Sequence, residues 1–81
     1  MMSNEEIDRI GEIIGYNVWY LMHSNGVSTE QLARATGVSY KTIKRIRNGL
    51  GSGSRLWIII SIADFFNVGV EELYKEEMEY E

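Results

Sequence analysis

Apolar residues recur at every third or fourth position in the first part of the chain. They are Ile7, Ile10, Ile14, Val18 and Leu21. Because an α-helix repeats about every 3.6 residues, this spacing predicts an amphipathic helix from about Glu5 to Ser24. Ser3 and Glu6 match the reciprocal capping pair that starts a helix, and Gly26 is typical of a helix end.

Two glycines, Gly11 and Gly15, lie inside this predicted helix. Each costs ~1 kcal/mol relative to alanine in a helix interior. Two interpretations are open: the glycines allow another helix to approach closely, or the helix simply tolerates them.

A short second helix is predicted over Thr29 to Thr36. Ser28 and Gln31 form another capping pair, and Leu32 and Ala33 are expected to face the core. The helix is expected to end at the glycine that follows Thr36.

A third helix follows directly after a glycine turn. Gly37 supplies the left-handed turn, and Ser39 caps a helix that runs from about Tyr40 to Asn48. Ile43 and Ile46, three residues apart, are expected to face inward.

Two further helices are predicted, over Arg55 to Asn67 and after Gly69. The run Trp57 to Ile60 favours a β-strand by propensity, but the surrounding apolar spacing is helical and no partner strand exists. The helical spacing comes from Leu56, Ile59 or Ile60, Ala63 and Phe66, and after Gly69 from Val70, Leu73 and Tyr74 facing inward. The sequence therefore predicts an all-α fold, a compact five-helix domain.

Length and composition exclude several classes of protein. The 81 residues suit a single domain over 1–81, with an acidic tail at about 75–81. The absence of cysteine excludes disulfide scaffolds and thiolate zinc sites, and the single histidine, His23, has no evident catalytic partner. We therefore expect no enzyme activity, metal, cofactor or small-molecule ligand. With no apolar run of about 18 residues and no signal-peptide pattern, we expect a cytoplasmic protein without membrane contact.

The charge distribution matters more than the net charge. The formal net charge of −4 argues, taken alone, against a nucleic-acid partner. However, the stretch from Gln31 to Ala63 contains no acidic residue and six basic ones. These are Arg34, Lys41, Lys44, Arg45, Arg47 and Arg55. A basic middle segment lies between two acidic flanks, either by chance clustering or because it contacts an anionic partner.

The segment Val27 to Gly49 has the form of a helix-turn-helix, at about 28–48: a capped short helix, a glycine turn and a second capped helix. The motifs that matter are Gly26-Val27-Ser28, Glu30-Gln31-Leu32-Ala33, Gly37-Val38-Ser39, Ile43-Lys44-Arg45-Ile46, Asn48-Gly49 and Ile62-Ala63-Asp64-Phe65-Phe66-Asn67-Val68. With these motifs the chain resembles the lambda-repressor-like helix-turn-helix domains of phage and bacterial regulators. The resemblance covers roughly Ile14 to Leu73.

The resemblance implies binding to double-stranded DNA, with the third helix in the major groove. Carried over by position, Tyr40 and Lys41 approach base edges. Arg45 lies one turn further on the same face, and Thr42 lies at the groove margin. Lys41 or Arg45 could donate to guanine O6 and N7. Contacts to the DNA backbone are expected from Thr29, Lys44, Arg47, Asn48 and Arg55.

The chain departs from the family pattern in its first and third helices. Members often pair an arginine late in the first helix with a glutamate late in the third, where this chain has Met22 and Arg47. Tyr16, Trp19 and Tyr20 stand where the first helix is normally charged. The loop after the third helix, Gly49 to Ser54, also lacks the usual basic or proline residues.

The fourth and fifth helices carry unusual apolar residues. Trp57 and Ile58 stand where the family is polar, and Phe65 replaces a small residue. We expect a homodimer interface formed by Trp57, Ile58, Phe65, Tyr74 and Met78. The alternative is that Trp57 packs on Trp19 and thickens a thin core.

These observations predict a sequence-specific, double-stranded DNA-binding transcriptional regulator of phage or mobile-element type, acting as a homodimer. The alternative is a protein-interaction module on the same fold, such as an antitoxin or antirepressor-like factor, with a protein partner. Salt-dependent binding to duplex DNA distinguishes the two.

Overall fold

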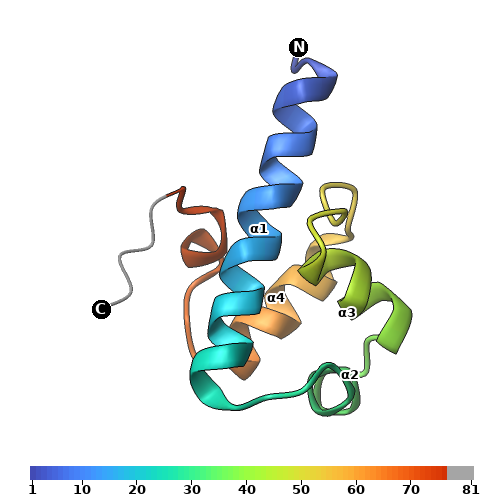
Figure 1. Cartoon of the computed structure of the whole chain (residues 1–81), viewed down its shortest axis with the longest axis vertical. Helices are drawn as coiled ribbons and strands as arrows, with labels where there is room; N and C mark the ends of the chain where they lie inside the picture. Colours follow the sequence, from blue (N-terminus) through green and yellow to red (C-terminus); the bar gives the residue numbers. More distant parts are fainter. Residues whose placement is uncertain (77–81) are drawn as a thin grey trace.

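The computed structural model describes residues 1–76, which form four α-helices and one 3₁₀ turn and contain no strand (Figure 1). The elements are α1 (Asn4–Asn25), α2 (Thr29–Thr36), α3 (Tyr40–Arg47), α4 (Leu56–Phe65) and the 3₁₀ turn η1 (Val70–Tyr74). The all-α prediction is confirmed, and the bounds of the four helices agree with those expected from the sequence to within two residues. Met78 and the end of the acidic tail lie outside the described residues.

The fifth element is a single 3₁₀ turn, so the prediction of a fifth α-helix was wrong. The fully buried Asn17 of α1 donates from Nδ2 to the carbonyl oxygens of Leu73 at 2.8 Å and of Lys75 at 3.0 Å. This amide replaces the backbone N–H donors that a continuing helix would supply, and the backbone is already extended at Lys75. A 3₁₀ turn repeats every three residues, so Val70 and Leu73 align inward while Tyr74 turns outward. Tyr74 is exposed, contrary to expectation.

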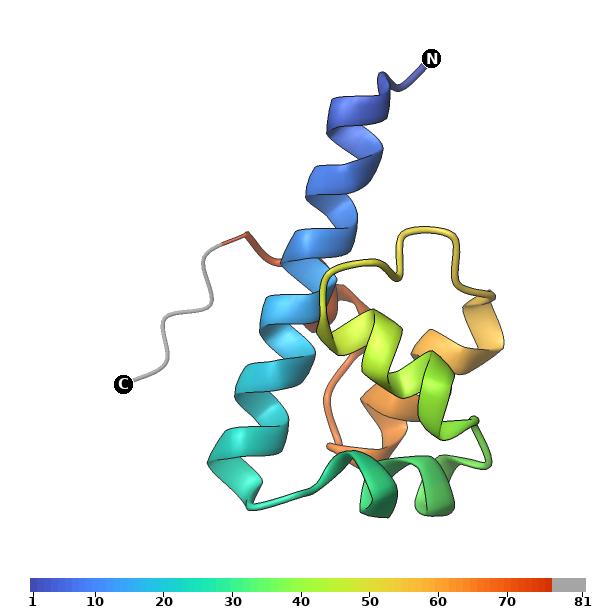
Figure 2. The same cartoon turned by 45° about the vertical axis from the view of Figure 1, so that its right-hand side comes forward.

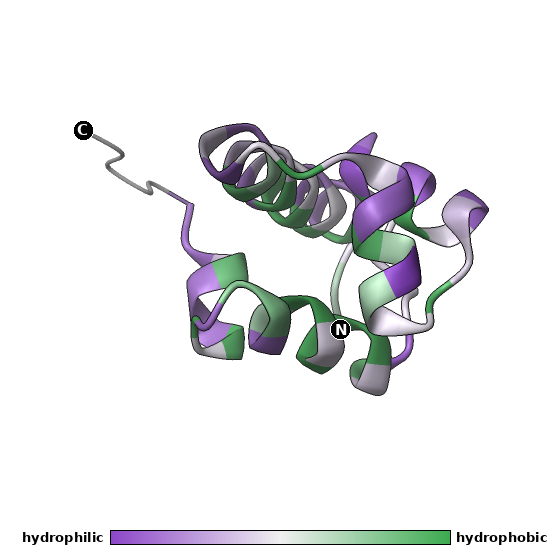
Figure 3. Ribbon diagram, turned by 90° about the horizontal axis from the view of Figure 1, so that it is seen from below, coloured by the Kyte–Doolittle hydropathy of each residue, from purple (hydrophilic) through white to green (hydrophobic). Residues whose placement is uncertain are grey.

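Each helix and the 3₁₀ turn contribute one apolar face to the core. Its buried side chains are Ile14, Val18, Met22, Leu32, Val38, Ile43, Ile46, Ile59, Ile62, Ala63 and Leu73. Figure 3 shows the hydrophobic stretches of the helices gathering toward the centre of the domain. Between the two alternatives in α4, Ile59 is the buried residue and Ile60 is exposed.

Two expected inward residues lie outside this core. Leu56 is exposed because it is the first residue of α4, and the buried contacts of that helix begin one turn later, at Ile59. Ile7 is exposed because the first turns of α1 project beyond the rest of the domain (Figure 1). The fully buried apolar residues of α1 therefore begin at Ile14, and Ile10 is partly buried against the core.

Gly11 and Gly15 allow a close approach, which decides between the two interpretations of these residues. A Cβ atom on Gly15 would lie 2.7 Å from the backbone nitrogen of Gly49 and 2.7 Å from the carbonyl oxygen of Ile46. On Gly11 it would lie 2.6 Å from the carbonyl oxygen of Gly49. The end of α3 and the loop after it thus press directly on the α1 backbone (Figure 2). This contact fixes the position of α3 relative to α1.

Candidate nucleic-acid interface

α3 presents an apolar face to the core and a cationic face to solvent. Ile43 and Ile46 are fully buried, which orients the helix. The exposed side chains of α3 and its C-terminal end are Tyr40, Lys41, Lys44, Arg45 and Asn48. No acidic residue lies in the first turn, and the last turn carries three cations. The exposed face of α3 is therefore suited to an anionic partner.

The start of α3 is fixed by local hydrogen bonds. The Ser39 hydroxyl accepts a hydrogen bond from the N–H of Thr42 at 3.2 Å and donates one to Thr42 Oγ1 at 2.9 Å. Gly37 makes the turn before it with a φ of 75°, a conformation that side chains with a Cβ disfavour. Val38 is buried in the corner between α2 and α3. The first residues of α3 therefore point in a defined direction.

The N-terminus of α2 leaves backbone donors available. The Ser28 hydroxyl accepts from the N–H of Gln31 at 3.1 Å, and the Gln31 side chain accepts from the N–H of Ser28 at 2.8 Å. The N–H groups of Thr29 and Glu30, in the first turn, have no acceptor within the helix. They lie at the positive end of the helix dipole, where an anion is favoured.

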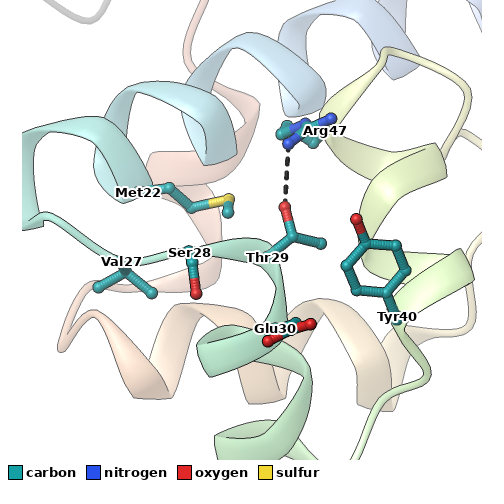
Figure 4. Close-up of a pocket in the computed structure, with 7 residues that line it drawn as sticks. All are labelled: Met22, Val27, Ser28, Thr29, Glu30, Tyr40 and Arg47. Carbon is teal, nitrogen blue, oxygen red and sulfur yellow. Dashed lines mark hydrogen bonds between the residues drawn. The ribbon is translucent and has the colours of Figure 1, made fainter.

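Arg47 joins the end of α3 to the start of α2. Its Nη1 donates a hydrogen bond of 2.9 Å to Oγ1 of Thr29, a residue that is almost fully buried (Figure 4). Both residues line a pocket together with Met22, Val27, Ser28, Glu30 and Tyr40. The pocket thus combines the guanidinium group of Arg47 with the N-terminus of α2, and the carboxylate of Glu30 also lines it. A guanidinium group and a helix N-terminus are both groups that bind phosphate.

A second pocket lies on the other side of α3. It is lined by Thr42, Arg45, Gly53, Ser54, Arg55 and Ile58. The fold thereby brings together Arg45 on α3 and Arg55 at the start of α4, which are ten residues apart in the sequence. Two pockets therefore flank the exposed face of α3, one lined by Arg47 and the other by Arg45 and Arg55.

A family model for the Cro/C1-type HTH DNA-binding domain matches residues 17–78. The chain belongs to this family. Membership establishes a helix-turn-helix domain that binds double-stranded DNA and supports a role as a DNA-binding regulator. Searches of curated proteins and of solved structures found no significant match.

The Cro/C1-type domain places all the predicted DNA-contacting residues on α3 or beside it. Tyr40, Lys41, Lys44, Arg45, Asn48 and Arg55 are exposed, and Thr42 and Arg47 are half-buried. Thr29 is nearly covered, and its hydroxyl accepts the hydrogen bond from Arg47. Ser54 also lines the second pocket and was not predicted from the sequence, because nothing in a glycine- and serine-rich loop distinguishes one serine from the next.

The predicted interface residues of the Cro/C1-type domain lie in different environments. Trp57 is 51% exposed, and Phe65 and Tyr74 are also exposed, whereas Ile58 is half-buried and lines the second pocket. Trp19 is 45% exposed and its ring stacks on His23 at a centroid distance of 5.3 Å. The alternative in which Trp57 packs on Trp19 in the core is therefore wrong.

The described residues, 1–76, contain no group of three or more histidine, cysteine, aspartate or glutamate side chains that could hold a metal ion. No helix among them has the length and apolar composition required to cross a membrane.

Proposed function

We propose that this Cro/C1-type domain is a sequence-specific regulator of transcription, of phage or mobile-element type, that inserts α3 into the major groove of duplex DNA. The observation that carries the proposal is the cationic exposed face of α3, which has a pocket containing an arginine on either side. The major groove is bordered by two phosphate backbones. A cationic helix with an arginine on either side matches that arrangement.

Base recognition is assigned to residues on the exposed face of α3. Lys41 and Arg45, one turn apart, carry donors that suit guanine O6 and N7. Tyr40 lies at the first position of the helix, which enters the groove in this family. Thr42 is at the margin, with its hydroxyl bonded to Ser39.

Phosphate contacts are assigned to the groups around that face. Arg47 and the first-turn N–H of Thr29 serve one backbone from the first pocket. Arg55 serves the opposite backbone from the second pocket, where Arg45 also lies. Lys44 and Asn48, exposed on α3, add contacts to the backbone. These contacts orient the domain, whereas base contacts select the sequence.

The binding species is proposed to be a homodimer. One short recognition helix contacts only a few base pairs, and a two-fold pair places two half-sites about 34 Å apart. Trp57, Phe65 and Tyr74 supply exposed apolar surface outside α3. Ile58 and Met78 are the other two residues that the sequence predicts for this interface.

Selection of bound sequences from random duplexes, followed by titration at several salt concentrations, tests this function. We expect a selected consensus and a slope of log affinity against log salt of about −3 to −6 per dimer, because only the cationic contacts release counterions. Absence of duplex binding at ~50 mM salt would favour the alternative of a protein-interaction module.

A further inference from the structure

An exposed row of aromatic rings runs along the C-terminal half of α1, away from the core. Tyr16 is 53% exposed and Trp19 45% exposed, with ring centroids 6.1 Å apart. The His23 ring continues the row, stacked on Trp19 with an interplanar angle of 5°. α1 contributes Ile14, Val18 and Met22 to the core, so these rings are not needed to close it.

The same row continues toward the N-terminus as carboxylates. The exposed residues that follow one another at intervals of three or four are Glu5, Asp8, Glu12, Tyr16, Trp19 and His23. Residues at this spacing lie on one face of a helix. α1 therefore carries an exposed stripe that is acidic in its first half and aromatic in its second. We call this set of six residues the α1 stripe.

The charges around the α1 stripe select the class of partner. Arg9, the cation of α1, forms an ion pair with Glu76, so it does not neutralise the stripe. Asp8 and Glu12 repel the phosphates of DNA, whose cationic contacts lie on α3 and at the start of α4. A symmetric dimer in which the stripe of one copy contacts the stripe of the other would bring two acidic surfaces together. A cationic peptide segment is attracted both by the carboxylates and by the faces of the aromatic rings.

We propose that the α1 stripe binds an arginine- or lysine-rich segment of another protein. The guanidinium or ammonium groups contact the carboxylates of Asp8 and Glu12, and the faces of Tyr16 and Trp19 accept a cation–π contact. The stripe does not include the exposed residues of α3 that are assigned to DNA.

The experiment titrates the full chain into a fluorescein-labelled peptide of alternating arginine and serine, and follows fluorescence anisotropy. Saturable binding is expected. The double variant Asp8→Asn/Glu12→Gln should reduce the affinity about tenfold, and so should each of the single variants Tyr16→Ala and Trp19→Ala. The matched control, Asp64→Asn with Glu71→Gln, removes the same charge from exposed sites outside the stripe and should change affinity less than about twofold. Circular dichroism and retained duplex binding show that each variant is folded.

Three results would overturn the proposal. One is equal weakening by the two charge pairs, because net charge alone then explains the attraction. The second is no saturable binding, or equal binding of a peptide of alternating glutamate and serine. The third is self-association that Tyr16→Ala abolishes in sedimentation, because the stripe would then be occupied by a second copy.

Discussion

Arg47, the last residue of α3, donates a hydrogen bond of 2.9 Å to the hydroxyl of Thr29, the first residue of α2. The two residues are 18 positions apart, and their bond connects the C-terminal end of α3 to the N-terminus of α2 at the first pocket. Where related proteins often use an arginine–glutamate pair between the first and third helices, this chain has Met22 and Arg47. The Arg47–Thr29 bond instead connects the two helices of the helix-turn-helix itself.

Arg47→Ala and Thr29→Val should each lower the free energy of unfolding, by about 0.5–2 kcal/mol, because each leaves a partner without its hydrogen bond. The double variant should lose less than the sum of the two, since the residues share one bond. Denaturant unfolding of all four proteins measures this coupling.

Lys44→Ala is the matched control, because it removes an exposed cation from the same helix. It should weaken DNA binding and leave stability unchanged to within about 0.5 kcal/mol. Additive losses for Arg47→Ala and Thr29→Val would mean that their bond contributes nothing to the fold.

Lys41→Ala and Arg45→Ala should relax sequence preference, each costing about 1–3 kcal/mol at one or two base pairs of the selected site. Lys44→Ala should instead weaken selected and random duplexes alike, as a phosphate contact does. Quantitative binding to the selected duplex and its single-base variants distinguishes the two patterns. If all three variants lose the same affinity for selected and for random DNA, the base contacts are misassigned and only a phosphate role remains.

Gly15→Ala should destabilise the domain by about 1–3 kcal/mol although alanine is the better helix former, because its Cβ would overlap backbone atoms of α3 and the following loop. Those atoms cannot rotate away as a flexible side chain would. Thermal unfolding measures the loss. Gly53→Ala is the control, since a Cβ there meets no atom within 4 Å. A Gly15→Ala protein as stable as the wild type would show that α1 and the loop are free to separate.

Trp57→Ala should leave the monomer folded, because the side chain is half exposed, and should weaken self-association and cooperative binding to two half-sites. Sedimentation with and without duplex DNA measures both. Leu56→Ala removes an even more exposed apolar neighbour outside the predicted interface and should have little effect. A wild type that remains monomeric at millimolar concentration and binds a single half-site would contradict the homodimer.

Local chemistry made the helices predictable from the sequence. A capping pair such as Ser28 with Gln31 acts across three residues, and its hydrogen bonds form as expected. The spacing of Ile43 and Ile46 identifies the buried face of α3 without reference to any other element. The basic residues on the opposite face follow from the same helical period.

Contacts between distant residues decided the rest. The Arg47–Thr29 bond depends on how the helices cross, and so does the presence of Arg45 and Arg55 in the same pocket. The spacing of residues along the chain does not determine that crossing. Exposure also has a tertiary origin, because an apolar side chain is buried only where another element covers it. Tryptophan at position 57 is compatible with core or surface by composition alone; the packing of α4 through Ile59, Ile62 and Ala63 turns it outward.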